Sequence, residues 1–207
     1  MTCGAPSTFM HAILNKETGL REPGQLLSQA SLVEVPETDR FIIVTDVAVN
    51  IAPDIDQKAS IIRNAARLAS CIGLNDPKIA LLSALEVENP AIPSTVEAAR
   101  IAEMLGGEFT IAGPLALDNA ISPEAARHKG VEGPVAGVAD ILVVPDLWSG
   151  NIFSKALVFF AHLNMAGVLC GLSRPAVMTS RSETPENKYY SILVSALQAL
   201  RMQGRAS

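Results

Sequence analysis

The fold is decided by residues 139–152, ADILVVPDLWSGNI. Residues 141–144 form an uninterrupted apolar run, which is typical of a strand covered on both faces of a sheet. A turn containing proline, aspartate and glycine follows, and the pattern of apolar residues after it predicts a helix over residues 152–164. A buried strand followed by a helix predicts an α/β unit with a parallel sheet.

Strands and helices alternate along most of the chain. Residues 31–35 and 41–46 flank the polar stretch PETDR, which predicts an antiparallel hairpin. Asp54 is placed to cap a helix, STVE at 94–97 predicts a capping box, and Ser122 before a proline predicts another helix start. Further elements follow the same patterns: helices at 6–18, 55–72, 94–105, from 123 and 185–202, and strands at 78–84, 109–112, 168–170 and 176–178.

Composition excludes several classes of protein. The 207 residues correspond to one large domain, or one domain and a fragment, at about 150 residues per domain. With 49% hydrophobic and 18% charged residues the chain is not disordered, and with 4% aromatic residues its core must be aliphatic. The net charge of −5 comes without a basic run, which argues against nucleic acid or an anionic membrane as partner.

The cysteines and histidines give no sign of a metal site or a disulfide framework. Three scattered cysteines without a C-x-x-C pair favour a reducing, cytoplasmic compartment, and the start MTCGAPST has no secretory signal. The histidines are isolated, so no metal is expected. The residues concerned are Cys3, Cys71, Cys170, His11, His128 and His162.

Four segments rich in glycine, proline or polar residues follow predicted strands, where ligands bind in open α/β sheets. They are residues 45–50, with Asp46 and Asn50; 112–120, with Gly113 and Asp118; 133–155, with Gly150, Asn151 and Lys155; and 179–187, with Ser180, Arg181, Glu186 and Asn187.

Two of these segments favour an anion. Gly150 and Asn151, placed at a predicted helix start, would offer free backbone N–H groups, and Lys155 adds a charge one turn later. Ser180 and Arg181 supply a hydroxyl beside a planar guanidinium that fits phosphate. Helix capping alone is the alternative for each. The chain has no phosphate-binding glycine loop of the common types and no G-x-S-x-G elbow, which argues against a hydrolase.

Taken together, five strings resemble the phosphate acetyltransferase and phosphate butyryltransferase family, and most nearly its butyryl branch. They stand in the family's order and cover the chain from about residue 8. The strings are TDVAVNIAP (45–53), GPLALDNAIS (113–122), PVAG-x-ADILVVPD (134–146), GNI-x-x-KALV-x-FA (150–161), and TSR (179–181) followed by ENK-x-YSI (186–192).

The resemblance implies a three-layer α/β/α fold like that of isocitrate and isopropylmalate dehydrogenases, with two domains and a cleft between them. Residues 22–170 would form the complete inserted domain, and residues 1–21 and 171–207 would be parts of the terminal domain. The turns at Pro23-Gly24 and 171–175 agree with these borders. The family's N-terminal α/β segment is expected to be missing, which would leave the terminal domain incomplete.

The resemblance also implies a reaction, acyl-CoA plus phosphate giving acyl phosphate plus CoA, with coenzyme A as substrate, no bound cofactor, and a homodimer. Ser180 would stabilise the oxyanion and Arg181 would hold the phosphoryl group. Asn187 would occupy the position of the base that deprotonates the thiol, so either Glu186 would replace it or the base would be absent. Asn151 and Lys155 would bind phosphate or the acyl phosphate. Substrate-binding roles are also expected for Asp46, Asn50, Gly113, Asp118 and Gly150.

Two functional hypotheses remain open from the sequence. The first is an active phosphate acyltransferase for a butyryl or other short acyl group. The second is a non-catalytic relative, or an isolated domain, that binds an anion or serves in oligomerisation. Motifs on both sides of the expected cleft favour the first, whereas the expected missing segment favours the second.

Overall fold

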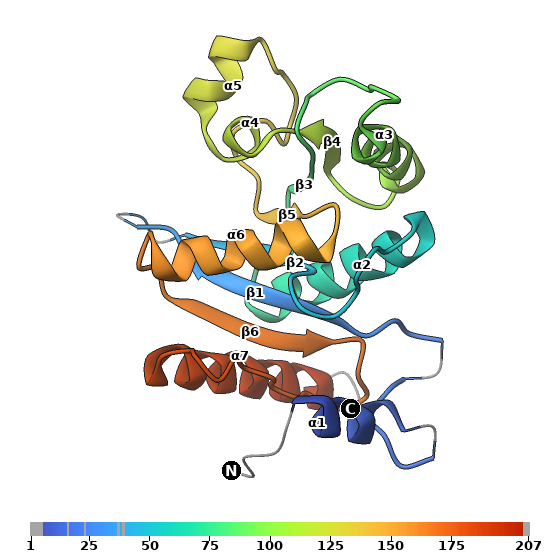
Figure 1. Ribbon diagram of the computed structural model, residues 1–207, viewed down its shortest axis with the longest axis vertical. Helices are drawn as coiled ribbons and strands as arrows, with labels where there is room; N and C mark the ends of the chain where they lie inside the picture. Colours follow the sequence, from blue (N-terminus) through green and yellow to red (C-terminus); the bar gives the residue numbers. More distant parts are fainter. Residues whose placement is uncertain (1–5, 16, 23, 37, 39, 205–207) are drawn as a thin grey trace.

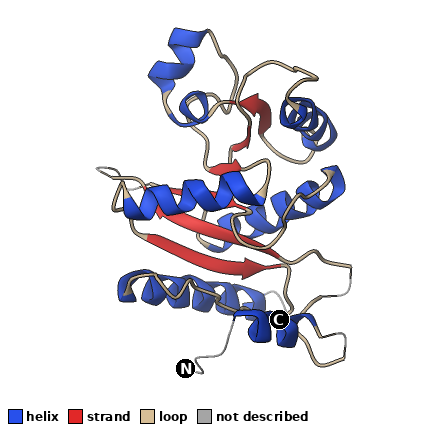
Figure 2. Cartoon of the chain, in the orientation of Figure 1, coloured by secondary structure: helices blue, strands red, loops and turns tan. Residues whose placement is uncertain are grey.

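The computed structural model describes residues 6–15, 17–22, 24–36, 38 and 40–204. Within them the chain forms an α/β fold in which helices lie on both sides of a central sheet, as predicted (Figures 1 and 2). In chain order the elements are α1 (Pro6–Leu14), β1 (Ser28–Glu34), β2 (Phe41–Thr45), α2 (Ile55–Cys71), β3 (Ile79–Leu82), α3 (Pro93–Leu105), β4 (Ile111–Leu115), α4 (Leu117–Ile121), α5 (Pro123–Lys129), β5 (Ile141–Val143), α6 (Leu147–Phe159), β6 (Met165–Cys170) and α7 (Pro185–Gly204).

The sheet is mixed, with the strand order β4-β3-β5-β2-β1-β6 in the described part of the chain. Strands β2, β5, β3 and β4 run parallel, whereas β1 is antiparallel to both β2 and β6. The predicted hairpin is confirmed, with Ala30 opposite Thr45 and Leu32 opposite Ile43. The carboxyl ends of β2 and β5 lie side by side, because Thr45 pairs with Val143.

Aliphatic side chains fill the space on each face of the sheet. On one face, Ile62 and Leu68 of α2 pack with Ile43 and Ile141 of the strands, and α3 and α7 extend this cluster. On the other face, Val44 and Leu142 pack with Val144 and with Phe153 of α6. Both faces of β5 are therefore covered, which explains why residues 141–144 are apolar without alternation.

Helix α7 protects the free edge of the sheet. Strand β6 would present unpaired backbone N–H groups at this edge, which is a liability for a sheet. Asn187 Oδ1 accepts a hydrogen bond from Met165 N at 3.0 Å, and Ser191 Oγ accepts one from Gly167 N at 2.9 Å. Four residues of an α-helix advance by about 6 Å, and two residues of a strand advance by about 6.6 Å. The spacing of Asn187 and Ser191 therefore matches that of alternate N–H groups in β6.

The predicted helix starts meet different outcomes. Asp54 caps α2 in a capping box with Gln57, and Ser122 caps α5 by accepting from Ala125 N at 3.2 Å, so both predictions are confirmed. The capping box predicted at 94–97 is wrong. A proline already occupies the first turn of α3, and the N-cap is Ile92, which makes no side-chain cap.

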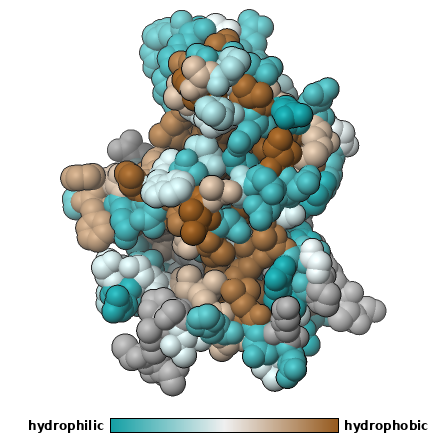
Figure 3. Space-filling model, turned by 45° about the vertical axis from the view of Figure 1, so that its right-hand side comes forward, coloured by the Kyte–Doolittle hydropathy of each residue, from teal (hydrophilic) through white to brown (hydrophobic). Residues whose placement is uncertain are grey.

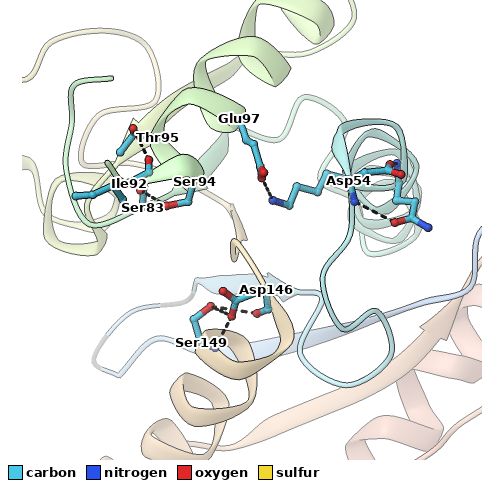
Figure 4. Close-up of polar contacts among 10 residues, drawn as sticks. Asp54, Ser83, Ile92, Ser94, Thr95, Glu97, Asp146 and Ser149 are labelled. Atoms are coloured by element: carbon cyan, nitrogen blue, oxygen red, sulfur yellow. Dashed lines mark hydrogen bonds and ion pairs between the residues drawn. The ribbon is translucent and has the colours of Figure 1, made fainter. Parts of the chain in front are cut away.

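The side chains of the expected capping box make other contacts (Figure 4). The hydroxyl of Ser94 lies 2.8 Å from that of Ser83, and Thr95 Oγ1 donates to the backbone oxygen of Ile92. Glu97 forms an ion pair with Lys58 of α2. These side chains therefore join α3 to its neighbours instead of capping it.

Two further predictions differ from the structure. Residues 176–178 form no strand, and only Ala176 makes an isolated bridge, to Leu169. Helix α6 begins at Leu147, five residues before its predicted start, with consequences for the site. Cys3 and Pro23 lie outside the described residues. The division into an inserted and a terminal domain stays a prediction, as does the dehydrogenase-like fold name.

Candidate functional site

A cavity of about 210 Å³ opens between α6 and the segment that precedes α7. Its floor is formed by Gln29 and Ser31 of β1 and Met165 of β6. The residues after β2 and one side of α6 form what we call the helix wall: Val47, Ala48, Asn151, Ser154, Lys155, Val158 and Phe159. The opposite side, which we call the loop wall, consists of Met178, Thr179, Ser180, Ser182 and Glu183.

The helix wall follows from helical spacing. Asn151, Lys155 and Val158 are separated by one turn each, so they lie on one side of α6 and face the cavity together. Lys155 has no ion-pair partner within the described part of the chain. An unpaired ammonium group beside an amide suits an anionic ligand.

The helix start predicted at Gly150 and Asn151, with free backbone N–H groups, is wrong. Gly150 and Asn151 lie inside α6, and the backbone N of Gly150 donates to the backbone oxygen of Asp146. The carboxylate of Asp146 caps the helix by accepting from Ser149 N at 2.8 Å and from Ser149 Oγ at 2.8 Å (Figure 4). Since a carboxylate of the chain itself holds this terminus, Asn151 and Lys155 reach the cavity from the side of the helix.

Asp46 and Asn50 build the turn that supports the helix wall. Asp46 is only 4% exposed, and its carboxylate accepts from the backbone N atoms of Ala48, Val49 and Asn50 at 3.0–3.1 Å and from Asn50 Nδ2 at 2.6 Å. Burial raises the pKa of this carboxyl above its ordinary value, although these hydrogen bonds oppose the shift. Asn50 Nδ2 also donates to the backbone oxygen of Leu27. Both side chains are occupied with the turn, and neither lines the cavity.

Three other residues expected to bind substrate have structural contacts. A Cβ on Gly150 would lie 2.8 Å from the backbone oxygen of Asp46, so glycine lets α6 approach the turn. A Cβ on Gly113 would lie 2.5 Å from the Leu81 side chain, so glycine lets β4 approach β3. Asp118 forms an ion pair with Lys129 at 3.0 Å, and this pair lowers the pKa of Asp118. None of the three lines the cavity.

The loop wall brings Ser180 to the cavity, but Arg181 is exposed and is not among the lining residues. Ser180 Oγ lies 2.9 Å from Ser182 Oγ. The backbone N of Ser180 donates to Glu183 Oε1 at 3.0 Å, and the backbone N of Glu183 donates to the backbone oxygen of Ser180 at 3.2 Å. The segment therefore forms a compact turn that presents two hydroxyl groups and one carboxylate.

The two residues expected at the position of the base lie elsewhere. Glu186 is exposed in the first turn of α7 and does not line the cavity. Asn187 is 2% exposed and serves the edge of β6 through Met165 N. The carboxylate that does line the cavity is Glu183, and burial raises its pKa, against the opposing effects of the Ser180 N–H, Lys188 and Lys155.

Glu183 and the polar residues of the cavity floor, Gln29 and Ser31, were not among the residues predicted for the site. Gln29 Nε2 donates to Ser31 Oγ at 3.1 Å, although both residues are almost fully buried. Two polar residues at alternate positions of an otherwise buried strand were the available signal. Gly167 leaves room for this pair, because a Cβ there would lie 2.5 Å from Gln29 Nε2.

A second cavity, of about 310 Å³, lies on the other face of the sheet, between α2, the end of β6 and α7. Cys71 and Cys170 line it, and both are free thiols. Burial raises the pKa of Cys170 to about 12, so this thiol is no nucleophile at neutral pH. Among the described residues, no group of histidine, cysteine and carboxylate side chains is arranged to hold a metal ion, and no helix is long and apolar enough to cross a membrane.

Comparison with known proteins identifies related chains over nearly the whole sequence. Phosphate butyryltransferase of Clostridium acetobutylicum is 43% identical over 93% of this chain and 65% of its own length. Phosphate acetyltransferase of Rhizobium meliloti is 44% identical over 93% of this chain and 62% of its own length. The chain thus spans just under two thirds of the length of these relatives.

Solved structures agree with the sequence comparison. A branched-chain phosphotransacylase from Enterococcus faecalis matches with a TM-score of 0.87 and 38% identity, over 94% of this chain and 71% of that chain. A phosphotransacetylase from Streptococcus pyogenes matches with a TM-score of 0.80 and 30% identity, over 96% of this chain and 61% of that chain. The family model described as phosphate acetyl/butaryl transferase matches residues 1–196. The chain therefore belongs to the phosphate acetyl/butaryl transferase family.

Proposed function

We propose that this chain transfers a short acyl group, butyryl or a similar one, between coenzyme A and phosphate. The observation that carries the proposal is the cavity in which Asn151 and Lys155 of the helix wall face Ser180 of the loop wall. An amide, an ammonium group and a hydroxyl around one space suit an acyl phosphate, which has a charged phosphoryl group and a carbonyl oxygen that gains charge on attack. The names of the family's members agree with this chemistry.

The proposed roles follow from these positions. Lys155 and Asn151 would hold the phosphoryl oxygens, and Ser180 would donate to the developing oxyanion. Arg181 would add a planar donor to the phosphoryl group, which requires its exposed side chain to turn toward the cavity next to Ser180. Coenzyme A would enter as a substrate, and its thiolate would attack the acyl carbon while phosphate departs.

The test is phosphate-dependent release of the CoA thiol, read with a thiol reagent, from acetyl-, butyryl- and isobutyryl-CoA. Turnover that requires phosphate with any of the three supports the proposal, and their relative rates define the acyl group. The matched control is the same reaction without phosphate. A folded chain that releases no thiol from any of them contradicts the proposal.

A non-catalytic relative that binds an anion is the second candidate. The observation in its favour is that Arg181 and Glu186 are exposed and do not line the cavity. Calorimetric titration with inorganic phosphate separates the two. Phosphate binding that Lys155→Ala abolishes, without any turnover, would support an anion-binding module.

Compartment and assembly complete the proposal. Free Cys71 and Cys170 fit a reducing cytoplasm. We propose a homodimer because α7 exposes a run of apolar side chains, which comprises Tyr189, Ile192, Leu193, Leu197 and Leu200. Apolar patches also interrupt the polar surface across the middle of the face in Figure 3. Light scattering behind a sizing column tests this point, and a mass of one chain at all concentrations would contradict it.

A further inference from the structure

Glu183 is the carboxylate of the substrate cavity. It lines the loop wall together with Ser180 and Ser182, and Lys155 is the charged residue of the helix wall that faces the same space. Glu183 Oε1 is held by the backbone N of Ser180 at 3.0 Å. The other carboxylate oxygen, Oε2, has no hydrogen-bond partner among the described residues. One oxygen therefore fixes the orientation of the carboxylate, and the other is available to a ligand.

The surroundings of Glu183 suit a proton acceptor. Partial burial raises its pKa, which brings its basicity closer to the working pH of an enzyme. The charges of Lys155 on α6 and Lys188 on α7 oppose this rise in the pKa of Glu183. The other charged groups nearby in sequence are Arg181 and Glu186, and both are exposed.

The alternatives for this role are weaker on geometry. Glu186 is exposed and lies outside the cavity. Asn187 has no basic group, and its Oδ1 is engaged by Met165 N. Asp46, in the turn beside the helix wall, has both oxygens occupied by that turn.

We propose that Glu183 is the catalytic base that takes the proton of the coenzyme A thiol, an inference that rests on the proposed function. The carboxylate accepts the thiol proton, and the thiolate then forms the C–S bond as the bond between the acyl carbon and the phosphate oxygen breaks. The electron pair of that bond leaves with phosphate, which takes the proton back from Glu183. Thiol and acyl phosphate dianion thus give thioester and monohydrogen phosphate, with proton and charge balanced.

The test compares Glu183→Gln with matched carboxylate variants. Glutamine keeps an oxygen that can accept from Ser180 N, so the turn is retained while the base is lost. We expect kcat for acyl phosphate and CoA to fall at least ~100-fold with KM changed less than ~3-fold, since general base catalysis contributes ~100-fold or more. The acidic limb of the pH profile should disappear, and Glu183→Asp should recover part of the rate.

Two control variants decide between rival explanations. Glu103→Gln changes an exposed glutamate of α3 that lies outside the cavity, and it should leave kcat unchanged. Glu186→Gln tests the rival position on α7. A loss confined to Glu186→Gln, or a Glu183→Gln variant with wild-type kcat and an intact acidic limb, would overturn the assignment while leaving the proposed function in place.

A binding measurement separates this inference from the proposed function. A carboxylate beside Lys155 should weaken the binding of inorganic phosphate, so protonation of Glu183 should tighten it. We expect Glu183→Gln to bind phosphate more tightly at neutral pH and with less dependence on pH than the wild type. Suppose that the wild type shows no turnover, but that wild type and Glu183→Gln differ in phosphate binding as expected. The proposed function and the catalytic role of Glu183 are then both overturned, and Glu183 is shown only to be the titrating group of the cavity. If neither is found, both fail.

Discussion

The two walls of the cavity are built in different ways. The helix wall is attached to the turn after β2, where the buried Asp46 carboxylate satisfies three backbone N–H groups and α6 packs against the same turn. The loop wall is a short turn closed by Ser180 and Glu183, and both Ser180 and Arg181 are exposed. Backbone satisfaction and packing hold the first wall, whereas a few hydrogen bonds hold the second.

This difference indicates that the two walls have different roles, one as a support and the other as a carrier of functional groups. Residues 45–50 and 150–151 belong to segments predicted to bind the ligand, but most of them shape the framework of the site. Residues 180–183 carry functional groups on a turn that a few hydrogen bonds hold in place. Substitutions in the turn that supports the helix wall should therefore affect stability first, and those in the loop wall should affect activity first. Catalytic groups can occupy such turns because a rigid scaffold positions them.

The largest expected effect is on activity, in the loop wall. We expect Arg181→Ala to lower phosphate-dependent CoA release at least ~100-fold, because a planar donor to the phosphoryl group is lost. Its free energy of unfolding, measured in urea, should stay within about 0.5 kcal/mol of the wild type, since the side chain is exposed. Arg181→Lys should recover only part of the rate, because lysine lacks the planar fork. An unchanged rate for Arg181→Ala would remove Arg181 from the site.

Asp46→Ala should give the largest loss of stability, in the turn that supports the helix wall. Three backbone N–H groups lose their acceptor in a partly buried turn, and we expect a loss of about 2–3 kcal/mol in the free energy of unfolding. Urea denaturation measures it. A stable Asp46→Ala protein that has lost only activity would reverse the comparison between the walls.

Asp46 should also leave a mark on the pH dependence of stability. Its pKa is raised in the folded state, so the native state binds its proton more tightly than the unfolded chain does. This contribution stabilises the protein fully below the unfolded pKa of about 3.9 and is lost as pH rises through the folded pKa. The difference between wild type and Asp46→Asn across acidic pH isolates this contribution. A difference that does not change with pH would contradict the direction of the shift.

Asn187→Ala tests whether this position is structural. The backbone N of Met165 would lose its acceptor at the edge of β6, and we expect a destabilisation of about 1–3 kcal/mol. The residual activity of the folded fraction should keep the pH profile of the wild type, because no titrating group is removed. A changed profile with unchanged stability would return Asn187 to the catalytic machinery.

Gly150→Ala should have the smallest effect of the four substitutions. Alanine favours a helix, but its Cβ would lie 2.7 Å from Val144 Cγ2 and 2.8 Å from the backbone oxygen of Asp46. We expect α6 to shift at a net cost of about 1–2 kcal/mol in unfolding free energy. Alanine at Gly107, which has open space around it, is the matched control and should not destabilise. Equal stability of the two variants would show that α6 yields without cost.

Local patterns predicted the elements better than the site. The apolar run at 141–144, the hairpin at 31–46 and the caps at Asp54 and Ser122 were predictable because neighbouring residues decide them. The predicted start of α6 is too late, because the residues before it are rich in glycine and polar side chains and so predict a loop. In the structure Asp146 caps the helix, which begins at Leu147. The motifs also revealed the family, and the comparisons confirm it.

The amino-acid sequence by itself determined the α/β alternation, the aliphatic core and the motifs of the family, since these depend on residues close together in the chain. Only the tertiary structure decided which polar residues face the cavity. Glu183 and Asn187 are four positions apart, yet one lines the cavity and the other holds the edge of β6. The physical reason is that the role of a side chain depends on which neighbours satisfy its polar atoms, and those neighbours come from distant parts of the chain.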